Sequence, residues 1–222
     1  MSDSFLVAAR IPMSREGFEA WLTTPVEGLA GIANPEEMFG GWLWDGRRAD
    51  HEWESVGDGT PGEYFAGRVE DSCAGDEDCG VLLHRDGALE AYLFHVGYPE
   101  WSVHMALLML AATGPFRSGQ AEDTVLFWAE TGANLWPADA DGWLAVLSVG
   151  ADGSWFVGER DLTDVVAGLR PAESRFFELV ARLGDESEDW DRESGEDFRT
   201  ETPRDASFTD PAVLAAGRRD DV

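Results

Sequence analysis

The pattern of apolar and polar residues along the chain indicates two β-hairpins most clearly. Each has an Asp-Gly pair at its turn, Asp86-Gly87 in the first hairpin and Asp152-Gly153 in the second. This dipeptide readily adopts the positive φ angles of a type I′ turn between antiparallel strands. The predicted strands beside the turns are residues 81–85, 88–95, 143–151 and 154–158. Residues 124–130, and residues 4–12 as an edge or opening strand, extend this predicted antiparallel sheet.

Apolar residues at helical spacing predict helices that pack on this sheet. The first begins at Ser14, a good N-cap residue, and places Phe18 and Trp21 on one face. The predicted helices are residues 14–23, 100–112, 161–168 and 171–183. Residues 26–62 read as loops and short strands, and residues 63–65 read as a further strand. Helices and strands do not alternate as in a parallel βαβ sheet, which favours an α+β fold.

The composition changes sharply after Gly184. Residues 185–197 contain eight acidic residues, with Trp190 as the one large apolar side chain among them. The sequence therefore predicts one α+β domain over residues 1–184, followed by an acidic C-terminal tail over residues 185–222. Within this tail, Asp210 and Pro211 begin a short predicted helix near residues 211–217.

The charge changes the functional picture more than any motif does. Forty-four acidic residues face 16 basic ones, which gives a formal net charge of −28. All the basic residues are arginines, so Schiff-base chemistry and a phosphate-loop lysine are excluded. A GC-rich coding sequence would also explain the absence of lysine, and salt adaptation would also explain the acid excess with the absence of lysine. The longest apolar run, residues 105–112, is too short to span a bilayer, and we expect a cytoplasmic protein without a membrane partner.

Sequence motifs for catalysis or for metal binding are weak. Residues 57–62 match the glycine spacing of a dinucleotide-binding loop, but the strand expected after them favours a plain turn. Cys73 and Cys79 do not have the spacing of a zinc site, and they fit two reduced thiols or one disulfide. The histidines His84, His95 and His104 with nearby carboxylates leave an enzyme of unknown chemistry as the alternative function. We expect no cofactor and no metal ion, and the sequence favours a non-enzyme.

We expect an acidic binding or inhibitory protein that captures a basic protein partner, because complementary charge steers association. The partner would be a toxin, a nuclease or a DNA-binding protein, which makes the chain similar in role to an immunity protein or to a nucleic-acid mimic. Direct binding of nucleic acid is disfavoured by the acid excess. Tryptophans within acidic segments are the expected anchors, surrounded by steering carboxylates. The predicted partner-binding residues are Trp190, Glu188, Asp189, Asp191, Trp53, Glu52, Glu54, Asp76, Glu77 and Asp78.

Overall fold

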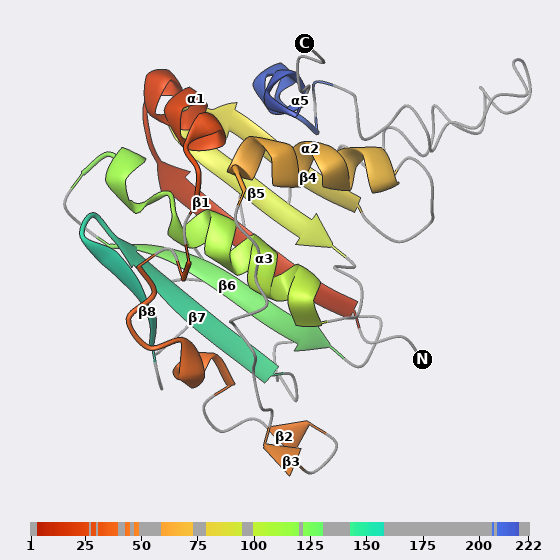
Figure 1. The fold of residues 1–222 in the computed structure, drawn as a ribbon, viewed down its shortest axis with the longest axis vertical. Helices are drawn as coiled ribbons and strands as arrows, with labels where there is room; N and C mark the ends of the chain where they lie inside the picture. The colour runs from red at the N-terminus through yellow and green to blue at the C-terminus, as the bar shows by residue number, and fades with distance from the viewer. Residues whose placement is uncertain are drawn as a thin grey trace, which may run out of the picture.

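A computed structural model gives the fold of the chain (Figure 1). The residues that it describes are 4–26, 28–29, 31–39, 43–44, 47–48, 59–72, 79–94, 100–119, 122–130, 143–157, 206 and 208–217. The predicted helices at residues 161–168 and 171–183 lie outside these ranges. So does the predicted domain boundary after residue 184.

A six-stranded antiparallel sheet forms the centre of the fold, in the order β4-β5-β1-β6-β7-β8. Its strands are β1 (Ser4–Pro12), β4 (Cys79–Arg85), β5 (Ala88–Phe94), β6 (Asp123–Glu130), β7 (Trp143–Gly150) and β8 (Gly153–Val157). A separate pair consists of β2 (Leu43–Trp44) and β3 (Arg47–Arg48). The opening strand β1 is not an edge strand, because it pairs with β5 on one side and with β6 on the other.

Both predicted hairpins are present. Asp86 and Gly87 connect β4 to β5 with φ angles of 51° and 71°, as a type I′ turn requires. In the second hairpin Gly150 pairs with Gly153, so that Ala151 and Asp152 occupy the turn between β7 and β8. Local turn chemistry thus fixes the hairpin positions to within one residue.

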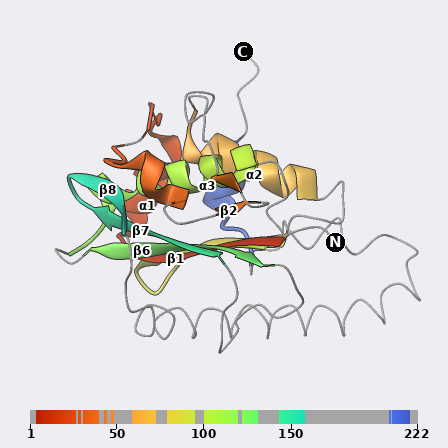
Figure 2. The same ribbon diagram turned by 90° about the horizontal axis from the view of Figure 1, so that it is seen from below.

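The longer helices cover one face of the sheet, as Figure 2 shows for α1, α2 and α3. The helices are α1 (Arg15–Thr23), α2 (Pro61–Ser72), α3 (Glu100–Ala111) and α5 (Pro211–Ala216), with the short 3₁₀ helices η1 (Pro35–Phe39) and η3 (Gly114–Phe116). Ser14 caps α1 by accepting a hydrogen bond from the Gly17 amide at 3.0 Å, as its sequence predicted. The predicted helices near residues 14–23, 100–112 and 211–217 are confirmed. No helix in the described ranges is long and apolar enough to cross a bilayer.

Helix α2 corrects one expectation, since residues 63–65 are helical and not a strand. Thr60 and Glu63 form a capping box, in which the Glu63 amide donates to Thr60 Oγ1 at 3.1 Å and the Thr60 amide donates to Glu63 Oε2 at 3.2 Å. Pro61 stands at the first helical position, and Phe65 is buried. The Glu63 carboxylate thus occupies the helix N-terminus, where a dinucleotide-binding loop would place a phosphate.

The hydrophobic core lies between the sheet and these helices. Alternate residues of the strands face it, and residues 105–111 of α3 are buried along their whole length. The strand residues on the opposite face are also buried, including Glu90 at 0% exposure and Ser148 at 0%. Residues 105–111 of α3 can be apolar all round because each of them is buried.

The outer edge of β8 is covered by the chain that follows Gly31. The Gly31 carbonyl accepts from the Ser154 amide at 3.1 Å, and the Ser154 carbonyl accepts from the Ala33 amide at 2.8 Å. The Asn34 side chain continues this pairing: Nδ2 donates to the Phe156 carbonyl at 3.0 Å, and Oδ1 accepts from the Phe156 amide at 2.8 Å. The exposed backbone groups that would otherwise invite strand addition are therefore satisfied.

The opposite edge, at β4, is covered in the same way by the C-terminal segment. The Leu82 amide donates to the Phe208 carbonyl, and the Asp210 amide donates to the Leu82 carbonyl, both at 2.8 Å. The Asp210 side chain then accepts a longer hydrogen bond of 3.4 Å from the His84 amide. At each edge of the sheet, a short segment thus forms one parallel bridge with the edge strand. A polar side chain that follows the bridge then bonds to the next backbone group of that strand.

Helix α5 follows this pairing and packs against α1 and α2 (Figure 1). The contact between α2 and α5 is close: a Cβ atom on Gly217 would overlap the side chain of Ala66, and one on Gly62 would overlap Ala216. Val213 is fully buried in the same interface. Residues 208–217 are thus part of the packed body.

A candidate binding cavity beside the β7–β8 turn

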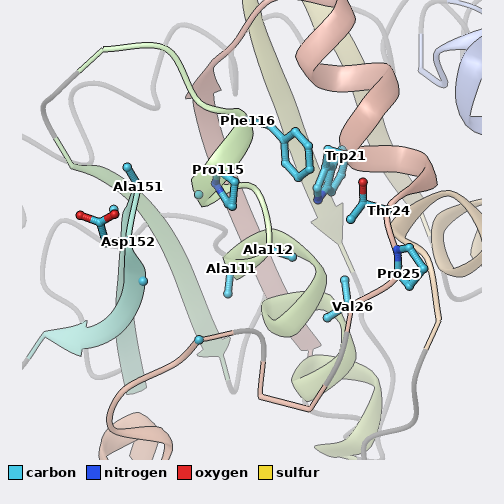
Figure 3. Close-up of a pocket in the computed structure, with 14 residues that line it drawn as sticks. Trp21, Thr24, Pro25, Val26, Ala111, Ala112, Pro115, Phe116, Ala151 and Asp152 are labelled. Carbon is cyan, nitrogen blue, oxygen red and sulfur yellow. The ribbon is translucent and has the colours of Figure 1, made fainter.

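A cavity of about 410 Å³ lies between the end of α1, the end of α3 and the turn that joins β7 to β8 (Figure 3). This volume falls in the range of about 300 to 1,000 Å³ that is typical of ligand pockets. Its lining consists of Trp21 with residues 24–26, Gly31, residues 111–112 and 114–116, and residues 150–153. Segments far apart in the sequence therefore build it together.

The floor of the cavity is apolar and fixed in position. Trp21 is fully buried, and its indole Nε1 donates to the Met109 carbonyl at 2.9 Å. Gly114 lies so close to the Gly150 carbonyl that a Cβ atom there would clash with it. The lining residues that precede Gly114, Ala111 and Ala112, have small side chains. Short side chains around two rings, Trp21 and Phe116, leave the space open.

The lining carries little that could perform chemistry. Asp152 is the one ionisable side chain among its described lining residues, and it is exposed at the turn. The Thr24 hydroxyl donates to the Ala20 carbonyl at 2.7 Å and so is already engaged. The described part of the lining contains no histidine, cysteine or serine. This arrangement suits binding of an apolar group and offers no nucleophile beside a base.

A second hollow, of about 510 Å³, lies on the other side of the same turn. Its polar lining includes Arg117, which donates to the Gly119 carbonyl at 3.3 Å, and Glu122, which accepts from Ser148 Oγ at 2.7 Å. Residues 150–153 and Gly31 line both hollows. The turn therefore borders two hollows, and the second has more charged side chains in its described lining than the first.

Arg15, Asp210 and His84 form a polar cluster at the other edge of the sheet. The guanidinium of Arg15 makes two hydrogen bonds to the Asp210 carboxylate, at 2.5 and 2.9 Å. Burial raises the pKa of Asp210, but hydrogen bonds from Arg15 and from the Ala212 amide outweigh it, so that the pKa is lowered overall. The pKa of Arg15 is raised, mainly by its hydrogen bond to Asp210.

The side chain of His84 makes packing and hydrogen-bond contacts within the fold. His84 Nε2 lies 2.9 Å from the Met13 carbonyl, and its ring packs at 5.5 Å from the ring of Phe18. His104 is buried in α3. Neither of the two described histidines, His84 and His104, lines either cavity, and His51 and His95 lie outside the described residues. In the part of the chain that the structure describes, no three metal-binding side chains come together.

A third cluster lies on the sheet face opposite the helices. Glu90 is fully buried and accepts a hydrogen bond of 2.6 Å from Arg85, while Arg10 approaches it to 3.6 Å from the neighbouring strand. Two arginines around one carboxylate compensate the cost of burying its charge. This cluster stabilises the pairing of β1, β5 and β4.

The predicted partner-binding residues fall in three segments that the structure does not describe. These residues are Trp190, Glu188, Asp189, Asp191, Trp53, Glu52, Glu54, Asp76, Glu77 and Asp78. Cys73 also lies outside the described ranges. Sequence reasoning identified Asp152 as a turn residue but missed the cavity beneath it, because alanines and glycines carry no chemical signal of a site.

Comparison with family models, with curated proteins and with solved structures finds no match to this chain. Charge and geometry are therefore what indicates a function for this chain.

Proposed function

We propose that this chain is a binding protein that captures a basic protein partner and inhibits it. The proposal includes the immunity type of inhibitor, which neutralises a cationic toxin or nuclease in the cytoplasm. The observation that carries it is the net charge of −28 together with the way the arginines are used. A partner of opposite charge gains both association rate and specificity from such a surface.

The described arginine side chains are all engaged within the chain. Arg10, Arg15 and Arg85 pair with carboxylates, Arg68 contacts the Tyr64 ring and hydroxyl, and Arg117 donates to a backbone carbonyl. Several acidic side chains are instead exposed and lie outside the arginine ion pairs: Glu36, Glu37, Glu122 and Asp152. The described surface therefore offers carboxylates to a partner and keeps its cations internally bound.

The alternative of an enzyme built on histidines gains no support from the described residues. His84 contacts a backbone carbonyl and an aromatic ring, and no described histidine lines either cavity. A nucleic-acid mimic remains a special case of the binding proposal, in which carboxylates would repeat at the spacing of DNA phosphates. Competition by double-stranded DNA for the captured partner would identify that case.

The test is capture at two salt concentrations, followed by reconstitution. The tagged chain is incubated with a lysate of the cells that encode it, in about 20 mM and in about 500 mM salt, where screening lengths differ severalfold. We expect a basic protein to be retained at low salt alone, and to rebind after purification with an association rate that falls as salt rises. A bait in which Glu188, Asp189 and Asp191 are changed to Gln, Asn and Asn is the matched control and should retain less. The proposal is wrong if no basic protein is retained, or if retention is the same at both salt concentrations.

A further inference from the structure

We propose that the cavity beside the β7–β8 turn is the anchoring site for the basic partner, and that it takes an apolar side chain carried on a basic segment. This inference rests on the proposed function and specifies its contact. The observation behind it is an apolar cavity of about 410 Å³ with a carboxylate, that of Asp152, at its rim.

The shape of the cavity favours an inserted side chain over an enclosed small molecule. Its floor is buried, as Trp21, Val26 and Ala111 show, whereas its rim is open to solvent. The exposed rim residues are Thr24, Pro25, Gly31, Pro115, Ala151 and Asp152. Small-molecule sites usually enclose about 70 to 90% of the ligand surface. An open rim instead allows a protein surface to lie across the mouth while one side chain enters.

Charge complementarity indicates which residues of the partner would flank its inserted side chain. Among the described residues of the lining, Asp152 is the one charged residue and none is an arginine. An apolar side chain between cationic neighbours would therefore meet an apolar floor and the Asp152 carboxylate at the rim, whereas acidic neighbours would be repelled by that carboxylate.

The cavity is held in shape before any partner arrives. The indole hydrogen bond from Trp21 to Met109 fixes the floor. The hydrogen bonds of Ser154 with Gly31 and Ala33 fix the start of β8 beside the turn. A site with few groups left to order loses less conformational entropy on binding.

Recognition by strand addition is disfavoured at the described edges, which adds to the case for the cavity. Backbone pairing covers β4 at Leu82 and β8 at Ser154, and the side chains of Asp210 and Asn34 continue each cover. A partner strand would have to displace these groups. Insertion of a side chain requires no such rearrangement.

The test uses blocked five-residue peptides with a fluorescent label, and binding is followed by anisotropy at low salt. The first peptide has tryptophan between two pairs of arginines, the second has alanine in place of the tryptophan, and the third has glutamates in place of the arginines. We expect the first to bind about tenfold to a hundredfold more tightly than the second, as burial of one aromatic side chain provides. We expect no binding of the third.

Variants of the chain then locate the site. Ala151→Trp at the exposed turn and Ala112→Phe deeper in the lining both fill the cavity, and each should remove the advantage of the tryptophan peptide. Asp152→Asn should weaken its binding by about twofold to fivefold, as loss of one exposed charge contact does. Asp86→Asn is the matched control, because it removes the same charge from the other exposed hairpin turn, and it should leave binding unchanged. Circular dichroism confirms that each variant is folded.

The outcomes separate this inference from the proposed function. Equal binding of the tryptophan and alanine peptides, or full binding by folded variants with a filled cavity, overturns the anchoring site while capture of a basic protein still stands. Binding of the glutamate peptide, or of free indole as tightly as the first peptide, identifies a general apolar site and also overturns the inference. If neither arginine peptide binds and no basic protein is captured, both proposals fail.

Discussion

Removal of the Asp210 carboxylate should detach the C-terminal segment from the β4 edge more than any other single polar change. This side chain caps α5 by accepting from the Ala212 amide at 3.0 Å, and it receives two hydrogen bonds from Arg15. It also accepts from the His84 amide at 3.4 Å. One carboxylate therefore joins α1, β4 and α5.

The magnitude follows from these contacts. Loss of an N-cap costs about 1 kcal/mol. Loss of the arginine pair costs about another 1 kcal/mol, and no more, because the Arg15 side chain is 41% exposed and can be rehydrated. Asp210→Ala should thus lower the free energy of unfolding by about 2 kcal/mol. Asp210→Asn keeps the cap and loses the charge, so it should cost about 1 kcal/mol.

Urea unfolding of the two variants, of Arg15→Gln and of the double variants measures these differences. We expect Arg15→Gln to couple to Asp210→Ala by about 1 kcal/mol in a double-mutant cycle. Equal losses for Asp210→Ala and Asp210→Asn would show that the cap contributes nothing. A coupling energy near zero would refute the argument for the ion pair.

The pH dependence of the same variants gives an independent check. Because the folded-state pKa of Asp210 is lowered, its stabilising effect is present above the unfolded-state pKa of about 3.9 and is lost as pH falls below it. The stability difference between the wild type and Asp210→Asn should therefore be full at pH 6 and shrink below about pH 4. A difference that stays constant down to pH 2.5 would contradict this assignment.

Further predictions concern the other edge, the α2–α5 contact and the predicted anchor. Asn34→Ala should cost about 1 to 2 kcal/mol and accelerate hydrogen exchange of the Phe156 amide, and unchanged exchange would exclude the side-chain cover of β8. Gly217→Ala should cost about 1 to 3 kcal/mol in urea unfolding because its Cβ would overlap α2, whereas Gly67→Ala, with open space around it, should stabilise by about 1 kcal/mol. Equal effects at the two glycines would contradict the close packing. Trp190→Ala should weaken capture of the basic partner without changing stability, and a loss of stability alone would mean that this side chain packs on its own chain.

The sequence predicts those parts of the fold in which local chemistry decides the structure. The Asp86-Gly87 turn and the Ser14 cap are specified by residues within a few positions of each other, and both are present. Helix α2 was missed because the aromatic pair Tyr64 and Phe65 resembles a strand. The capping box of Thr60 with Glu63 was the signal that could have identified the helix.

The cavity and the edge covers could not be predicted, because they depend on contacts between distant segments. Asn34 bonds to Phe156 across 122 positions, and Arg15 bonds to Asp210 across 195. Nothing in the local sequence distinguishes these polar side chains from others on the surface. The position of Trp21 opposite the β7–β8 turn likewise follows from the packing of α1 on the sheet.

Charge and cavity would act at different distances in the recognition that we propose. Screening limits the reach of the exposed carboxylates to about 8 to 10 Å, which is enough to guide a basic partner toward the surface but carries little information about its shape. The cavity acts only on contact. There it favours a partner that places an apolar side chain over the cavity. Neutralising exposed acids should therefore lower the association rate, whereas filling the cavity should raise the dissociation rate. Recognition of this kind does not displace the segments that pair with the described sheet edges at Leu82 and Ser154.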